Sequence, residues 1–152
     1  MDAVQFLNTL NAPQPGAYTQ VALVDLGNVI YAHLAGVTGN IPDGKDEPMI
    51  EGGLGPQVTQ TLRNIFAILE TVESWLNARE FNIVSMDVYL HPDTSQEDWV
   101  TFNKAYEAFF AERGRTRALV NLPPRASVGA KWLPLPGEPT LVEMKATAVI
   151  SR

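Results

Sequence analysis

The 152-residue chain contains no cysteine, so disulfide bonds, thiol catalysis and cysteine-ligated metal sites are excluded. It has only two histidines, His33 and His91, and no spacing typical of a metal site stands out. No glycine-rich loop of nucleotide-binding spacing precedes a helix. We therefore expect neither a metal nor a cofactor.

Basic residues are also scarce, with 11 Lys and Arg against 17 Asp and Glu and a formal net charge of -6. Nucleic acid is a poor partner for such a chain, because binding it relies on neutralised phosphates. No apolar run approaches the roughly 20 residues that span a bilayer. The N-terminus lacks the basic region and apolar core of a secretory signal, so we expect a cytoplasmic protein without membrane contact.

What remains is an ordinary globular composition, with 45% apolar and 18% charged residues. That length and composition predict one domain over residues 1–152, with 1–16 as an irregular lead-in containing Pro13, Pro15 and Gly16. Residues 17–36 predict a hairpin that turns at Asp25-Leu26-Gly27-Asn28. The Gly- and Pro-rich stretch that follows predicts a loop, and an apolar stripe then predicts a helix over 56–78.

Residues 81–91 alternate and predict a strand with Val84, Met86, Val88 and Leu90 on one face. Ser95 and Asp98 predict a capping box at the start of a second helix, which Gly114 ends. The apolar face of that helix carries five aromatic residues: Trp99, Phe102, Tyr106, Phe109 and Phe110. Three further strands are expected at 117–122, from Arg125, and at 141–150.

This order predicts an α+β domain with both helices on one face of a mixed β-sheet. The terminal strand is apolar on one side and mixed on the other, which indicates self-association through the second sheet face. Arg125 and Glu143 fall on the polar faces of what we expect to be neighbouring strands. They either solubilise a sheet face or bind a small charged substrate.

Six segments resemble, in order, the YjgF/Rid family of enamine/imine deaminases. They are "GAYTQ", "VDLGNVIYAHLAG", "QVTQTLRNIFAILE", "FNKAYEAFF", "PRASVGAKWLP" and "LVEMKATAV". The resemblance implies a chorismate-mutase-like fold that forms a homotrimer around a central β-barrel-like core, with sites between subunits. It also implies cofactor-free hydrolysis of a 2-imino acid, or a related carboxylate-bearing enamine, to a 2-oxo acid and ammonia.

By the same resemblance, Arg125 holds the substrate carboxylate and Glu143 orients and activates water. Tyr18, Gly36, Asn103 and Ser127 match positions that line the pocket. For Arg125 and Glu143 the alternatives are a surface salt bridge and a solvated strand residue. Tyr18 and Asn103 are otherwise a core aromatic residue and a helix-surface amide.

The chain departs from the family pattern at several points. Ala35 stands where a serine is common, and the segment before Arg125 is longer, so Arg117 competes as the aligned arginine. Longer loops and Trp132 suit a larger substrate, such as an aminomuconate-type enamine. Two other hypotheses remain. The protein is a regulatory module that binds a carboxylate metabolite without turnover, or it is a lyase or isomerase acting on a related enamine.

Overall fold

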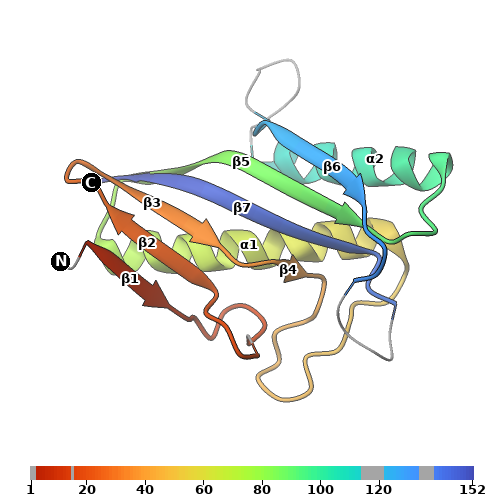
Figure 1. The fold of residues 1–152 in the computed structure, drawn as a ribbon, viewed down its shortest axis with the longest axis horizontal. Coiled ribbons are helices and arrows are strands. Elements are labelled where there is room, and N and C mark those ends of the chain that lie inside the picture. Colours follow the sequence, from red (N-terminus) through yellow and green to blue (C-terminus); the bar gives the residue numbers. More distant parts are fainter. Residues whose placement is uncertain (1–2, 15, 114–121, 134–138) are drawn as a thin grey trace.

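The computed structural model describes residues 3–14, 16–113, 122–133 and 139–152 (Figure 1). In chain order its elements are β1 (Val4–Leu7), β2 (Val21–Asp25), β3 (Val29–Leu34), β4 (Val37–Thr38), α1 (Leu54–Leu76), β5 (Glu80–Leu90), α2 (Gln96–Glu112), β6 (Arg125–Gly129) and β7 (Val142–Ser151). The strands form one mixed sheet in the order β1-β2-β3-β7-β5-β6, and β4 pairs with β7. Among the strand pairs of the described residues, only β5–β6, which α2 connects, is parallel.

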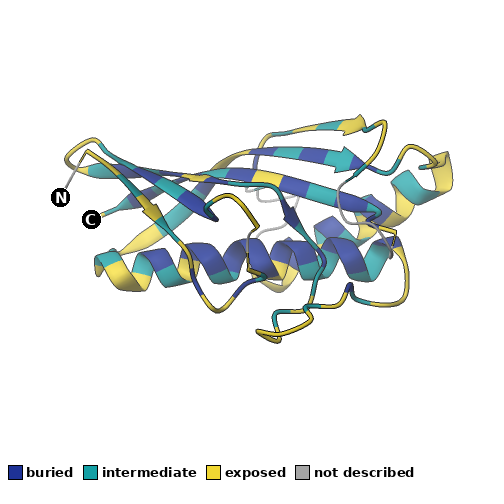
Figure 2. Cartoon of the chain, turned by 60° about the horizontal axis from the view of Figure 1, so that its bottom comes forward, coloured by how far each residue is buried: buried dark blue, intermediate teal, exposed yellow. Residues whose placement is uncertain are grey.

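Both helices lie against the same face of the sheet, and no helix among the described residues covers the other face (Figure 2). Alternate residues of β7 point toward the helices and are almost fully buried: Val142, Met144, Ala146, Ala148 and Ile150. They pack against α1, whose buried stripe includes Val58, Leu62, Ile65, Leu69 and Val72. The predicted α+β arrangement is therefore confirmed.

Helix α1 begins at Leu54, two residues earlier than the sequence suggested, after Gly53 at a φ of 86°. It ends where Asn77 adopts a left-handed conformation, with its N–H directed at the carbonyl oxygens of Glu73 and Ser74. The capping box of α2 is present. The Ser95 hydroxyl accepts the Asp98 N–H at 3.1 Å, and the Asp98 carboxylate accepts the Ser95 N–H at 2.8 Å.

Three expectations need correction. The lead-in is not wholly irregular, because β1 pairs with β2 at the sheet edge. The segment after the hairpin is not only a loop, because β4 pairs with β7. Val84 is 39% exposed, because a register shift between Ile83 and Ser85 puts Ile83 on the buried face instead. Gly114 and residues 117–121 of the predicted strand lie outside the described residues.

The strands that carry Arg125 and Glu143 are not neighbours. Strand β5 lies between β6 and β7 and pairs with both of them. Within the part of the chain that the structure describes, no helix is long and apolar enough to cross a membrane.

Candidate functional site

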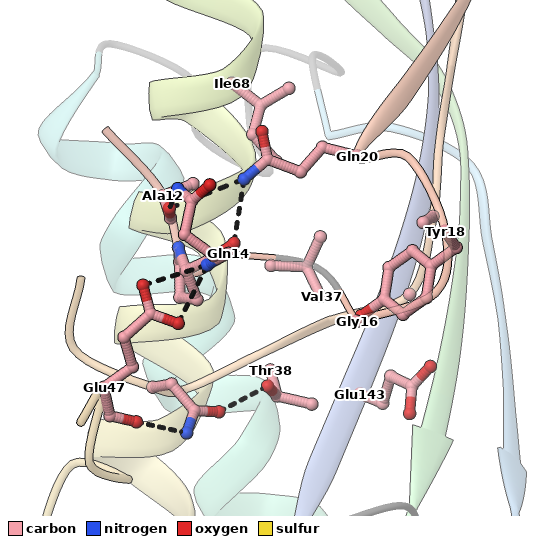
Figure 3. Close-up of a pocket in the computed structure, with 14 residues that line it drawn as sticks. Ala12, Gln14, Gly16, Tyr18, Gln20, Val37, Thr38, Glu47, Ile68 and Glu143 are labelled. Carbon is pink, nitrogen blue, oxygen red and sulfur yellow. Dashed lines mark hydrogen bonds between the residues drawn. The ribbon is translucent and has the colours of Figure 1, made fainter. Parts of the chain in front are cut away.

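A cavity of about 420 Å³ opens beside Glu143 (Figure 3). The segment before β2, the β3–β4 region with the loop that follows it, α1 and β7 all contribute to its wall. Its lining consists of Ala12, Pro13, Gln14, Gly16, Tyr18, Gln20, Ala35, Gly36, Val37, Thr38, Asn40, Glu47, Ile68 and Glu143.

The cavity exists because the strand next to β7 is interrupted. Strand β3 pairs with β7 as far as His33, which lies opposite Thr147. Strand β4 resumes the pairing opposite Met144 and Glu143. The break between these two pairings falls at Ala35 and Gly36. There the Cα of Gly36 approaches the Glu143 carboxylate so closely that a Cβ would overlap it.

Gln20 fixes the segment that forms one wall of the cavity. Its Oε1 accepts the Thr9 N–H at 2.5 Å, and its Nε2 donates to the Pro13 carbonyl at 2.8 Å. The side chain is only 4% exposed, so these hydrogen bonds are shielded from water. The Gln of the "GAYTQ" motif thereby holds the residues before Tyr18 against the body of the domain.

The Glu143 carboxylate is half-buried, and burial raises its pKa. In the sheet Glu143 pairs with Thr38 on one side and Tyr89 on the other. Tyr18 lines the same cavity, and the pKa of its hydroxyl is raised by burial and by the Glu143 charge. A partly desolvated carboxylate beside a neutral phenol can take a proton from water and return it.

Arg125 belongs to a second group of residues, between β6 and α2. Its guanidinium donates a hydrogen bond to the side-chain oxygen of Asn103. It also lies over three aromatic rings of α2, at 4.4 Å from the Tyr106 centroid, 4.9 Å from Phe102 and 5.4 Å from Trp99. The amide and the rings orient the guanidinium, which is the group best suited to hold a carboxylate with two hydrogen bonds.

Two hydroxyl groups complete this second group. Ser127 Oγ and the Tyr106 hydroxyl are buried, and neither has a hydrogen-bond partner among the described residues. Burial raises the pKa of Tyr106 to about 12, against an opposing effect of Arg125, so the phenol stays neutral. Buried hydroxyl groups usually have partners, so this pair marks a place where a ligand atom or water would complete the hydrogen bonding.

The six residues singled out in the sequence therefore fall into two groups, with Tyr18, Gly36 and Glu143 in one and Arg125, Asn103 and Ser127 in the other. The groups lie on opposite faces of the sheet, because paired residues on adjacent strands point to the same face. Arg125 pairs with Met86, which faces the helices, and Glu143 pairs with Tyr89, which does not. The expectation that both side chains lie on polar faces of neighbouring strands is wrong.

Sequence reasoning missed Glu47 and Tyr106. Glu47 sits in a loop without periodicity, so no pattern marked it. Tyr106 was placed in the core from the helical repeat, which is correct but hides its contact with Arg125. The competing Arg117 lies outside the described residues. Trp132, which we expected to suit a larger substrate, is 71% exposed.

The described residues contain no group of three or more His, Cys, Asp or Glu side chains that could hold a metal ion.

Comparison with known proteins places these features in a family. The family model described as "Endoribonuclease L-PSP" matches residues 9–150. The chain is 32% identical over 142 residues to the 2-iminobutanoate/2-iminopropanoate deaminase of Escherichia coli, covering 93% of this chain and 94% of that protein. It is 31% identical over 142 residues to a RutC family protein of Pyrococcus horikoshii, covering 92% and 93%.

Solved structures agree with the sequence relatives. The YjgF gene product of E. coli has a TM-score of 0.69 at 30% identity and covers 97% of this chain and 98% of that one. E. coli TdcF, solved with bound serine, has a TM-score of 0.69 at 25% identity and the same coverage. The chain, with its two-helix mixed sheet and its cavity beside Glu143, belongs to the YjgF/Rid family.

Proposed function

We propose that this protein is a cofactor-free deaminase that hydrolyses 2-imino acids to 2-oxo acids and ammonia. The observation that carries the proposal is the half-buried Glu143 carboxylate, which lines a cavity with Tyr18 and has its pKa raised by burial. A carboxylate in such a setting suits general acid–base work on water. Arg125, oriented by Asn103 and three aromatic rings, is the proposed clamp for the substrate carboxylate.

Both groups can act on one substrate only if they come from different copies of the chain. Within one chain Arg125 faces the helices, and Glu143 faces the uncovered side of the sheet. The uncovered face also carries apolar side chains, among them Phe6, which is 67% exposed. A homotrimer that packs these faces together, with Arg125 of one protomer beside the cavity of the next, accounts for both features.

The reaction needs three events, which these residues can supply. Arg125 and the Ser127 hydroxyl hold the carboxylate and so fix the imine carbon near Glu143. Glu143 accepts a proton as the water oxygen bonds to the imine carbon, and the C=N double bond becomes a single bond. Glu143 returns this proton to the nitrogen, which gives a carbinolamine with one hydroxyl and one NH2 group. Glu143 then takes the proton of the hydroxyl group and passes it to the NH2 nitrogen, so the C–N bond breaks and ammonia leaves as the C=O double bond of the 2-oxo acid forms.

The relatives support this reading at the level of chemistry. One of them is named as a deaminase of 2-iminobutanoate and 2-iminopropanoate, and another holds serine, an amino acid with the carboxylate that Arg125 would bind.

The family model carries the name of an endoribonuclease, but RNA suits this chain poorly. The net charge is -6, and the described cavity lining has two carboxylates and no cationic side chain.

Complementation between two inactive variants tests the proposal. We expect Arg125→Ala and Glu143→Gln each to lose the acceleration of imine decay, with imines generated in place by an amino-acid oxidase. After unfolding and refolding as an equal mixture, up to about one quarter of the sites regain both residues, and activity returns to that extent.

The possible results separate the hypotheses. Wild-type protein that leaves imine decay unchanged, yet is stabilised against heat by 2-oxo acids, would point to a binding module without turnover. Active single variants would refute the assigned roles. Single variants that are inactive and do not complement each other would refute a site shared between protomers.

A further inference from the structure

We propose that the cavity beside Glu143 accepts the side chain of the substrate, and that it selects 2-imino acids with a long side chain ending in a positively charged amine or guanidinium group. This inference rests on the proposed function and adds the substrate class. Its basis is the shape of the cavity and the position of a second carboxylate, Glu47, away from Glu143 along the wall (Figure 3).

The size of the cavity suits a substrate with a long side chain. The cavity volume of about 420 Å³ lies within the roughly 300–1,000 Å³ of pockets that bind small organic molecules. A four-carbon imino acid would occupy only part of it. Between Glu143 and Glu47 the wall includes Val37, whose apolar side chain suits the methylene groups of a longer side chain (Figure 3).

The charge of the cavity lining favours a cationic ligand group. The described residues that line the cavity include two carboxylates, Glu47 and Glu143, and no lysine, arginine or histidine. The ion pairs recorded among the described residues involve neither of them. A second carboxylate on the substrate would therefore meet only like charge here, whereas a cation would be attracted.

Glu47 is held in place by hydrogen bonds. Its carboxylate oxygens accept the Gln14 N–H at 2.9 and 2.8 Å. Its own N–H donates to Asp43 Oδ1 at 2.9 Å, and its carbonyl accepts from Asn40 Nδ2 at 2.6 Å. The backbone of Glu47 has a φ of 45°, which is unusual for a residue other than glycine. The loop thus holds both the backbone and the carboxylate of Glu47 at the cavity wall.

These positions define how the substrate would lie. Its imine nitrogen is near Glu143, and its own carboxylate points out of the cavity toward Arg125 of a neighbouring protomer. Its side chain passes Val37 and ends at Glu47. The cationic end can then form a charge-assisted hydrogen bond with an acceptor that is already oriented.

Four matched imines test this inference. An amino-acid oxidase forms them in place from arginine, citrulline, glutamate and 2-aminobutanoate. Arginine and citrulline have nearly the same shape and differ in charge. We expect kcat/KM for the arginine imine to exceed that for the citrulline imine about tenfold, and the glutamate imine to be the slowest. Glu47→Gln should remove the difference between arginine and citrulline.

Asp46→Asn is the control, because it removes one charge from the same loop at a residue that does not line the cavity. It should preserve the preference for arginine. Equal rates for arginine and citrulline in the wild type, or a fast glutamate imine, would overturn the inference while the deaminase proposal stands. Should none of the four imines be accelerated, the proposed function fails and this inference with it. If Glu47→Gln does not fold, the wild-type ratios decide alone.

Discussion

Gly36, in the break between β3 and β4, lies so close to Glu143 on β7 that no side chain fits at position 36 without moving the carboxylate. The atoms that a Cβ would meet all belong to the Glu143 side chain, and its Oε1 is the nearest. The glycine therefore leaves the space that the carboxylate occupies. Since a glutamate side chain can rotate away, the contact controls the position of Glu143 more than the stability of the fold.

Gly36→Ala is expected to fold normally and to lose most of its activity. The methyl group displaces the Glu143 carboxylate, and a catalytic group moved by about 1 Å can cost roughly a hundredfold in rate. Imine hydrolysis and the thermal midpoint are measured together. Gly16→Ala is the matched control, because Gly16 lines the same cavity and a Cβ there meets nothing within 4 Å. Unchanged kcat in Gly36→Ala would contradict the role of Glu143.

Glu143→Gln is expected to lower kcat by roughly 100- to 10,000-fold, the usual contribution of a general acid–base group. In the wild type, activity should fall on the acid side with an apparent pKa above the ordinary glutamate value of about 4.3, because burial raises the pKa of Glu143.

Stability gives an independent check of the same residue. A raised pKa in the folded state means that the folded chain binds more protons than the unfolded chain. Glu143 therefore lowers stability as the pH rises from about 4.3 through the raised pKa. Glu143→Gln should be more heat-stable than the wild type at pH 7, and the gap should close at acid pH. A gap that is the same at every pH would show that the carboxylate is not desolvated.

The regular elements could be predicted because their signals are local. The apolar stripe of α1 repeats at helical spacing over many residues, and Ser95 and Asp98 form a capping box within three residues of each other. The hairpin of β2 and β3 was predictable for the same reason, because its turn residues lie directly between the two strands in the sequence. Elements of this kind are decided by neighbouring residues, so the sequence displays them.

The side of the sheet on which Arg125 lies could not be predicted in this way. Strand β6 has no alternation of apolar and polar residues, and its register against β5 depends on how α2 crosses over. The resemblance supplied the residues of the site but not their separation into two groups. Glu47 reaches the cavity through a loop whose shape depends on Asn40, Asp43 and Gln14, contacts that no spacing in the sequence reveals.

Arg125→Lys is expected to raise KM about ten- to a hundredfold with a smaller change in kcat. Lysine cannot hold a carboxylate with two parallel hydrogen bonds, and it loses the planar stacking on Tyr106. Steady-state kinetics on the 2-aminobutanoate imine measure both constants. Arg113→Lys is the control, because Arg113 also stacks on an aromatic ring, at 3.9 Å from the Phe109 centroid. An equal KM increase in both variants would argue against a direct contact with substrate.

Ser95→Ala is expected to destabilise the fold by about 1 kcal/mol, because the alanine cannot accept the Asp98 N–H at the start of α2. That corresponds to a fall in the thermal midpoint of roughly 2–4 °C. Ser74→Ala, on the exposed surface of α1, should change stability by less than about 0.5 kcal/mol. Equal midpoints for Ser95→Ala and the wild type would show that α2 does not depend on its cap.

Val149→Asp is expected to break the proposed trimer. Val149 lies near the C-terminal end of β7, paired with Tyr31 on one side and Asn82 on the other, on the sheet face that no described helix covers. A buried, unpaired carboxylate at the centre of an interface costs several kcal/mol, whereas on a free surface it costs little. Light scattering after size exclusion should give the mass of one chain for this variant and of three for the wild type.

The same substitution at Val100 provides the control for assembly. Val100 is 47% exposed on α2, on the side of the sheet away from the proposed interface. Val100→Asp should therefore remain trimeric and active. Because the proposed site needs Arg125 and Glu143 from different protomers, Val149→Asp should lose imine hydrolysis together with its assembly. A Val149→Asp protein that is monomeric yet fully active would show that one chain suffices, and a monomeric wild type would remove the shared site altogether.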